Sequence, residues 1–262
     1  MRLRTRTPRC AAIAGLALFT AAALTACSSD DDTATDTAAD DTSSSETAEA
    51  PDASAPQAPV QELILSEGEA PGGGVVQVID PPLLKENVDK LVADQNRKLM
   101  ENEACDKVAR LETVSNHATE DGVTAAVRYK QSEEDETEHR FGIGMVGQKL
   151  DDFMDRSLYE ACTTSPSAAN PNVELVMRVE DAPPVDGVQG FRVISDFITT
   201  QPDGSRTMSR AVALHGFSRD TTVSVEYAAR GDNPEADPVI PTAAGALDAI
   251  YTAQMEKIVN AE

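Results

Sequence analysis

Few residues in this chain of 262 have the type and spacing that chemistry requires. The three histidines, His117, His139 and His215, lie far apart, and none has a second metal ligand or a nucleophile at a defined spacing. There is no G-x-S-x-G elbow to present a serine, no H-E-x-x-H pair to hold zinc and no S-x-x-K motif. We therefore expect no catalytic residue, no metal site and no cofactor.

Two of the histidines have simpler interpretations. His139 lies in SEEDETEHR, between two predicted strands, and we expect it in a solvated, charged turn rather than in a metal site. His215 alternates with the apolar Leu214 on a predicted strand, so its side chain faces away from that strand's apolar side. We expect His215 on the surface or lining a groove, with a catalytic role as the alternative.

The N-terminal 26 residues have the pattern of a secretory signal peptide. Residues 1–9 contain four arginines and no acidic residue, and an apolar stretch of 14 residues, 11–24, follows. A bilayer-spanning helix needs about 20 apolar residues, so an uncleaved anchor helix is the less favoured alternative. We predict that residues 1–26 are removed on export.

Residues 24–27, Leu-Thr-Ala-Cys, resemble the lipobox of bacterial lipoproteins. In that family the cysteine thiol receives a diacylglyceryl group and the signal peptidase then cuts before it, which would leave Cys27 as the lipidated N-terminus. Two acyl chains give a stable membrane anchor, whereas one binds only marginally. The resemblance implies a protein held on the extracytoplasmic face of the cell membrane. A cut after Ala26 that leaves Cys27 free is the alternative.

Residues 27–60 have the composition of a disordered acidic tether. Residues 28–60 are almost all Ser, Asp, Thr, Ala, Glu and Pro, with nine acidic and no basic residues, and cannot fill a core. A flexible chain of this length spans on the order of 30 Å. The segment lacks the spaced ligands and the turn glycine of a calcium-binding loop.

The remaining residues, 61–262, have the length of a single folded domain. The whole chain has a formal net charge of −23, and removing residues 1–60 leaves about −18 on this domain. Such a domain repels phosphate backbones, so we expect no nucleic-acid partner. Aromatic residues make up 4% of the chain and tryptophan is absent, which disfavours a carbohydrate-binding surface.

The domain contains two of the four cysteines, Cys105 and Cys162. An even pair of cysteines in an oxidising compartment usually bonds, so we predict a Cys105–Cys162 disulfide. The alternative is a pair of free buried thiols. Closing a loop of this length would contribute about 4 kcal/mol to stability on the chain-entropy model.

Six segments alternate between apolar and other residues with period two, as half-buried strands do. Their apolar positions are Val123, Ala125, Val127 and Tyr129; Phe141, Ile143 and Met145; Val173, Leu175, Met177 and Val179; Phe191, Val193 and Phe197; Met208, Val212 and Leu214; and Val223, Val225 and Tyr227. The sequences QPDGS and SRDT separate the last three segments and predict hairpin turns.

Apolar residues follow helical spacing in three further segments. These are Leu84, Val88, Leu91 and Val92; Leu150, Phe153, Met154, Leu158 and Ala161; and Leu247, Ile250, Tyr251 and Ile258. Asp151, Asp152 and Asp155 would stabilise the positive end of the second helix dipole. The fold class we predict is α+β, an antiparallel sheet with the helices packed on one face and one disulfide.

This layout resembles the extracellular sensor domain of the mycobacterial serine/threonine kinase PknH, as found in small actinobacterial lipoproteins. The shared features are a helix, a cysteine in the loop after it, a second helix that ends at a second cysteine, an antiparallel sheet and a closing helix, over about residues 80–262. That family typically has two disulfides and a tryptophan near a cysteine, where this chain has one cysteine pair and no tryptophan. The resemblance implies a binding or sensing module and assigns no ligand residue.

The leading hypothesis is a lipid-anchored envelope protein whose non-catalytic, sensor-like domain binds a lipid, another small molecule or an envelope protein. One alternative is an envelope hydrolase whose site is assembled from distant residues. A cleft that holds His215 beside a serine or a carboxylate would favour the hydrolase. The other alternative is a structural or adhesive envelope protein.

Overall fold

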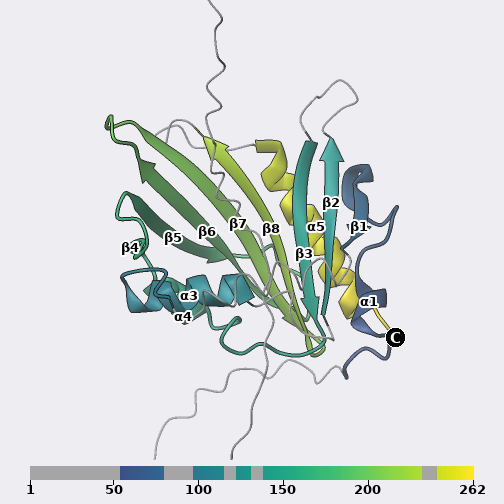
Figure 1. Cartoon of the computed structure of the whole chain (residues 1–262). Coiled ribbons are helices and arrows are strands. Elements are labelled where there is room, and N and C mark those ends of the chain that lie inside the picture. Colours follow the sequence, from purple (N-terminus) through teal and green to yellow (C-terminus); the bar gives the residue numbers. More distant parts are fainter. Residues whose placement is uncertain (1–53, 80–96, 115–121, 131–137, 232–240) are drawn as a thin grey trace, which may run out of the picture.

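A computed structural model of the chain describes residues 54–79, 97–114, 122–130, 138–231 and 241–262. The strands in these ranges form one antiparallel sheet of eight strands in the order β1-β2-β3-β8-β7-β6-β5-β4 (Figure 1). Every strand pair in the sheet is antiparallel. The α+β class, the antiparallel sheet and the Cys105–Cys162 disulfide are confirmed.

The described elements begin with a short helix and end with a long one. They are α1 (Val60–Leu63), the 3-10 helix η1 (Pro71–Gly73), β1 (Val75–Val78), α3 (Glu103–Val114), β2 (Gly122–Lys130), β3 (Glu138–Val146), α4 (Arg156–Ala161), β4 (Thr164–Pro166), β5 (Val173–Asp181), β6 (Gln189–Thr200), β7 (Arg206–Ser218), β8 (Thr221–Gly231) and α5 (Pro241–Val259). Each of the six segments predicted from period-two alternation lies in a strand.

The two hairpin turns predicted from the sequence are present. In the β6–β7 turn, the Gln201 N–H donates to the Ser205 carbonyl at 2.7 Å, and Gly204 has φ +83°. In the β7–β8 turn, Arg219 and Asp220 have φ of +49° and +57°. Two successive positive φ values match the type I′ turn, whose twist suits a tight hairpin.

The helices follow the sequence less closely than the strands do. The third predicted helix is α5, while the first predicted helix, at residues 84–92, lies outside the described residues. The second begins at Arg156 rather than at residue 150, because Asp155 caps it by accepting a hydrogen bond from the Ser157 N–H at 3.0 Å. Asp151 and Asp152 lie in the preceding turn, so the expectation that they begin the helix was wrong.

Helix α3 was not predicted, and it changes the setting of Cys105, which lies in its first turn and not in a loop. Asn102 precedes the helix, and its side-chain oxygen accepts a hydrogen bond from the Cys105 N–H at 3.2 Å, as an N-cap residue does. The apolar stripe is short, since Cys105 and Val108 are the fully buried residues of its first two turns. So short a stripe gives a weak helical signal.

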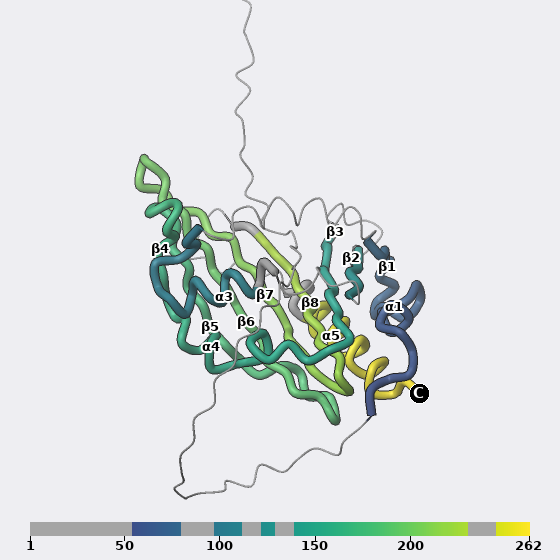
Figure 2. The backbone as a smooth tube through the Cα atoms, turned by 60° about the horizontal axis from the view of Figure 1, so that its bottom comes forward, coloured from purple at the N-terminus to yellow at the C-terminus, as the bar shows by residue number. Residues whose placement is uncertain are grey.

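The helices lie on opposite faces of the sheet, so the expectation that they share one face was wrong. The register places Ile143, Val225 and Leu214 side by side on one face, where they pack in the same cluster as α5. Phe191 and Val193 point to the other face and pack with residues of α3 and α4. In Figure 1, α5 crosses behind β3 and β2, and both views place α3 and α4 at the end of the sheet near β4 and β5 (Figures 1 and 2).

The α5 face contains the larger apolar cluster. Leu247, Ile250, Tyr251, Met255 and Ile258 of α5 are each at most 2% exposed. Helix α5 lies close to β6 and β7 because glycines occupy the contact positions. A Cβ atom at Gly216 would lie 2.8 Å from the Tyr251 hydroxyl oxygen, and one at Gly190 would overlap the same oxygen.

The segment before η1 packs against α5 and extends the folded unit N-terminal to residue 61. Val60 is buried, and the Gln57 N–H donates to the carbonyl of Glu262 at 2.9 Å. The buried Gln254 side chain donates to the Leu63 carbonyl at 2.8 Å and accepts from the Leu65 N–H at 3.0 Å. In the ranges that the structure covers, no helix has the length and apolar character to cross a membrane.

Candidate functional site

His215 lies in the core and not on the surface. Its side chain is fully buried, and its ring centroid lies 4.3 Å from that of Phe153 and 5.2 Å from that of Phe191. Tyr159 of α4 completes this aromatic cluster, at 5.5 Å from His215. The expectation of a surface or groove-lining residue was wrong because α4 and the turn before it cover this side of β7.

A serine lies directly across the strand pair from His215. Ser224 of β8 is its partner in register, and neighbours in register share a face of the sheet. Both side chains are buried, at 0% and 1% exposure, and no described residue makes a hydrogen bond to the Ser224 hydroxyl. The structure thus brings together the two residue types that a hydrolase needs, but a substrate cannot reach them.

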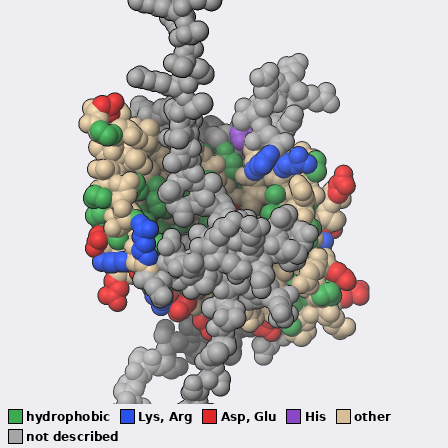
Figure 3. Space-filling view, in the orientation of Figure 1, with side chains coloured by type: hydrophobic (Ala, Val, Ile, Leu, Met, Phe, Trp, Pro, Cys, Tyr) green, Lys and Arg blue, Asp and Glu red, His purple; other side chains and the backbone are tan. Residues whose placement is uncertain are grey.

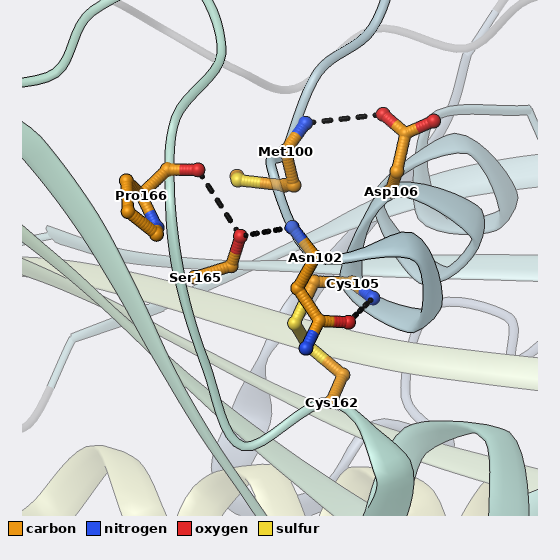
Figure 4. Close-up of a disulfide and its surroundings, with 7 residues drawn as sticks. All are labelled: Met100, Asn102, Cys105, Asp106, Cys162, Ser165 and Pro166. Carbon is orange, nitrogen blue, oxygen red and sulfur yellow. Dashed lines mark hydrogen bonds between the residues drawn. A yellow bond between two sulfur atoms is a disulfide. The ribbon is translucent and has the colours of Figure 1, made fainter.

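The disulfide packs in the same apolar cluster as Tyr159 and Phe191, and Figure 4 shows it with the polar residues around it. It joins Cys105 in the first turn of α3 to Cys162 at the end of α4, with a Cα–Cα distance of 4.7 Å, and both residues are buried. The buried Ser165 hydroxyl accepts a hydrogen bond from the Asn102 N–H at 2.9 Å and donates to the Pro166 carbonyl at 3.1 Å. The arrangement fixes α3 to β4.

Asp106 adds a second contact between α3 and the chain before it. Its carboxylate accepts hydrogen bonds from the Leu99 and Met100 N–H groups and from Arg110. Burial alone would raise the pKa of Asp106, but these hydrogen bonds outweigh it and the pKa is lowered. The carboxylate therefore holds the start of α3 in place.

His139 is also buried rather than solvated. It lies in β3, 5% exposed, and its Nδ1 atom lies 3.3 Å from the Tyr227 hydroxyl oxygen. Burial raises the pKa of Tyr227. The expectation of a charged turn was wrong because β3 begins at Glu138, one residue before the histidine. His117 and Cys27 lie outside the described residues.

No three His, Cys, Asp or Glu side chains within the described ranges gather closely enough to hold a metal ion. A group of charged and apolar side chains, most of them at least partly exposed, lies instead on the α5 face of three neighbouring strands. We call it the β5–β7 patch. It consists of Val176, Arg178 and Glu180 of β5, Arg192, Ile194 and Asp196 of β6, and Arg210 and Val212 of β7.

The register gives the β5–β7 patch an apolar centre with charges on both sides. Ile194 lies between Arg178 and Val212 across the strands, and both apolar residues are half-buried. One neighbouring row contains the pair Asp196 and Arg210, and the other contains Glu180 and Arg192. An apolar centre surrounded by polar residues is the usual layout of a protein-binding surface.

The charges on one side of the patch are tightly paired. Arg210 donates two parallel hydrogen bonds to the Asp196 carboxylate, at 2.6 and 2.8 Å, and these bonds raise the pKa of Arg210. Arg178 lies 3.4 Å from the same carboxylate, and its side chain is 48% exposed. Arg178 can therefore still offer guanidinium N–H groups to a bound molecule.

The other side of the patch is connected to α5. Arg192 donates to Asp248 of α5 at 2.6 Å and lies 3.8 Å from Glu180. The patch contains three arginines and two acidic residues, and Asp248 brings the local charge close to balance. A region without net charge is unusual in a chain of formal charge −23, and it allows another acidic protein to approach.

The opposite face of the sheet has two neighbouring arginines. Arg128 and Arg140 are direct partners in register on β2 and β3, where like charges disfavour pairing. Arg128 lies near the C-terminal end of β2 and Arg140 near the N-terminal end of β3. Figure 3 shows basic side chains over this part of the sheet. Both arginines make further interactions within the molecule, so we assign them no binding role.

The sequence contained a signal for the β5–β7 patch. Arg192, Ile194 and Asp196 occupy the positions that alternate with the apolar Phe191, Val193 and Phe197. The alternation assigned the three to one face, but the pairing of Asp196 with Arg210 required the register of β6 with β7. No protein-family model matches the chain, and comparison with curated protein sequences gives no match either.

Proposed function

We propose that this chain is a lipid-anchored protein of the cell envelope whose α+β domain binds another envelope protein without catalysing a reaction. The lipobox-like residues 24–27 support the anchor, and the buried Cys105–Cys162 disulfide fits an oxidising compartment outside the cytoplasm. The binding or sensing module that the resemblance to the kinase sensor domain implies is consistent with this binding role.

The observation that carries the binding role is the layout of the β5–β7 patch. Its centre, Ile194 and Val212, is apolar, and Arg178 beside it is accessible. Arginine at such a position can donate several hydrogen bonds to a partner and pack its flat face against it. The buried His215 and Ser224, by contrast, support the hydrolase hypothesis poorly.

Site-specific photo-crosslinking in intact cells tests the binding role. A photoreactive residue at position 178 should give one discrete adduct, while the same residue at position 203, on the exposed β6–β7 turn, should give none. Arg178→Glu placed beside a photoreactive residue at position 180 should weaken the adduct, because it puts a negative charge next to Asp196. Equal adducts at positions 178 and 203 would contradict the proposal.

The anchor is tested separately by replacing the modified cysteine. Cys27→Ser should move the protein from the membrane fraction to the soluble fraction, because the thioether to the lipid cannot form. If the Cys27→Ser protein stays with the membranes, the lipid anchor is wrong, whatever the crosslinking shows.

A small amphiphilic ligand is the second candidate for the patch. The exposed Arg178 could bind its acidic group, and Ile194 could contact its hydrocarbon part. Native mass spectrometry of the exported protein distinguishes the two, since a bound ligand adds a mass that disappears on solvent extraction.

A further inference from the structure

The strand β1 forms one edge of the sheet and exposes apolar side chains. Its neighbour in the sheet is β2, and it has no neighbour on its other side among the described residues. Val75 is 44% exposed and Val78 is 55% exposed, and they are the large hydrophobic residues that the described part of the chain leaves in solvent. An exposed apolar edge strand is a template for pairing with another strand.

The hydrogen-bond pattern shows which backbone groups face the open side. The Ile79 N–H donates to the Thr124 carbonyl at 2.8 Å, so residues 75, 77 and 79 direct their backbone groups toward β2. Val76 and Val78 therefore direct their N–H and C=O groups outward. No hydrogen bond joins these outward groups to any described residue.

We propose that the occupant of this edge is β1 of a second copy of the chain, paired antiparallel about a two-fold axis at Gln77. In this register Val76 of each copy faces Val78 of the other, and each pair exchanges both main-chain hydrogen bonds, about four in total. Gln77 faces Gln77 of the second copy, so two side-chain amides meet, and each can donate to the other.

The strand β1 has no charge that would oppose pairing with a copy of itself. The sequence Val-Val-Gln-Val has no charged side chain, so the pairing places apolar residues opposite apolar residues and opposes no like charges. This matters because the copies repel each other elsewhere, with a formal charge of about −18 on residues 61–262 of each. The other edge strand, β4, is also uncharged, but it has three residues and ends at a proline, Pro166, which has no N–H to donate to a partner strand.

A cysteine at position 77 tests the pairing directly. In the proposed register the two copies of residue 77 form a non-hydrogen-bonded pair with Cα atoms about 4.5 Å apart, a distance that a disulfide spans. The full-length Gln77→Cys protein, oxidised in its own membrane, should form a covalent dimer on non-reducing gels. The control is Glu256→Cys, on an exposed position of α5, with wild type measuring the background from the native cysteines.

A second variant separates specific pairing from random collision. Val78→Pro removes an outward N–H without removing a hydrogen bond to β2, so the sheet of each copy should stay intact. Gln77→Cys should form dimer roughly tenfold faster than Glu256→Cys, and adding Val78→Pro should remove that excess. Equal rates for the two cysteine variants, or no effect of Val78→Pro in a protein of unchanged melting temperature, would overturn the inference. Neither result depends on the β5–β7 patch.

Discussion

The two halves of the sheet are stabilised in different ways. The half formed by β2, β3 and β8 has one long helix, α5, which contributes five nearly fully buried side chains to a large apolar cluster. The half formed by β4, β5 and β6 has two short helices on the opposite face and a smaller cluster. The disulfide lies in the second half, between those short helices.

The difference shows where a covalent link is most useful. Helix α4 has six residues, too few to be stable without tertiary contacts, and α3 buries a short stripe. The disulfide compensates by restricting the unfolded chain and by fixing α3 to the end of α4. In the α5 half the larger apolar cluster contributes most of the stabilisation, and no disulfide joins its described elements.

The largest effect is expected from removing the disulfide. Replacing Cys105 and Cys162 together with alanine should lower the free energy of unfolding by about 4 kcal/mol, since the loop between them is no longer closed. Hydrogen exchange should increase first in α3, α4 and β5, while α5 and β8 stay protected. Uniform acceleration across both halves would show that they are one cooperative unit and would contradict the comparison.

A smaller loss is expected from a methyl group on the α5 side. Gly190→Ala places a Cβ atom against the Tyr251 hydroxyl and should cost about 1–3 kcal/mol, because α5 must move away from β6. Gly245→Ala, within α5, is the control: a Cβ atom there meets nothing within 4 Å, and the melting temperature should stay the same or rise because alanine favours the helix. Thermal melting of both variants checks the expectation, and equal melting temperatures would show that the contact is not restrictive.

Arg219 offers a third test, at the C-terminal end of α5. Its guanidinium donates to the carbonyls of Ile258, Val259 and Ala261 and to that of Ser54. Arg219→Ala should cost about 1–2 kcal/mol in a denaturant titration, because the helix end loses these donors. Arg219→Gly should cost less, since glycine adopts the positive φ of +49° without strain. An unchanged stability of Arg219→Gly would show that the hydrogen bonds contribute little, and the reverse order of the two variants would show that the positive φ is not strained.

The smallest effect concerns pH and the segment before β1. The Lys257 ammonium and then the Ser66 hydroxyl hydrogen-bond to Glu69 and lower its pKa from 4.5 to about 2. A lowered pKa means that this stabilisation is complete above pH 4.5 and is lost as the pH falls toward 2. Glu69→Gln should therefore be less stable than wild type at pH 6, with a difference that narrows below pH 4.5. A difference independent of pH would exclude this origin.

The predictions from sequence were most accurate where a local period decides the structure. Alternation identified β2, β3 and β5–β8, and two turn sequences identified the hairpins, because strand period and turn conformation depend on neighbouring residues. Helix α3 was missed because its stripe, Cys105 and Val108, is too short to give a helical signal. The cysteine pair was correctly joined because the domain has two cysteines and therefore one possible pairing.

Burial of polar residues could not be predicted from the sequence. Alternation correctly predicted that the His215 and Leu214 side chains point to opposite faces of the sheet. Whether the His215 face is exposed to solvent depended on α4, which is distant in the chain. The same holds for His139, whose partner Tyr227 lies on a strand about ninety residues later. The pairing of Asp196 with Arg210 also required a register between strands.

The sequence by itself determined the strands β2, β3 and β5–β8, the two hairpins, the last helix and the disulfide, because each depends on local spacing or on a unique cysteine pair, whereas the short edge strands β1 and β4 were not predicted. The tertiary structure decided which face each helix covers, which histidines are buried and which residues meet in the β5–β7 patch. These outcomes depend on packing between distant segments, and a buried position is defined by what covers it rather than by its own residue type.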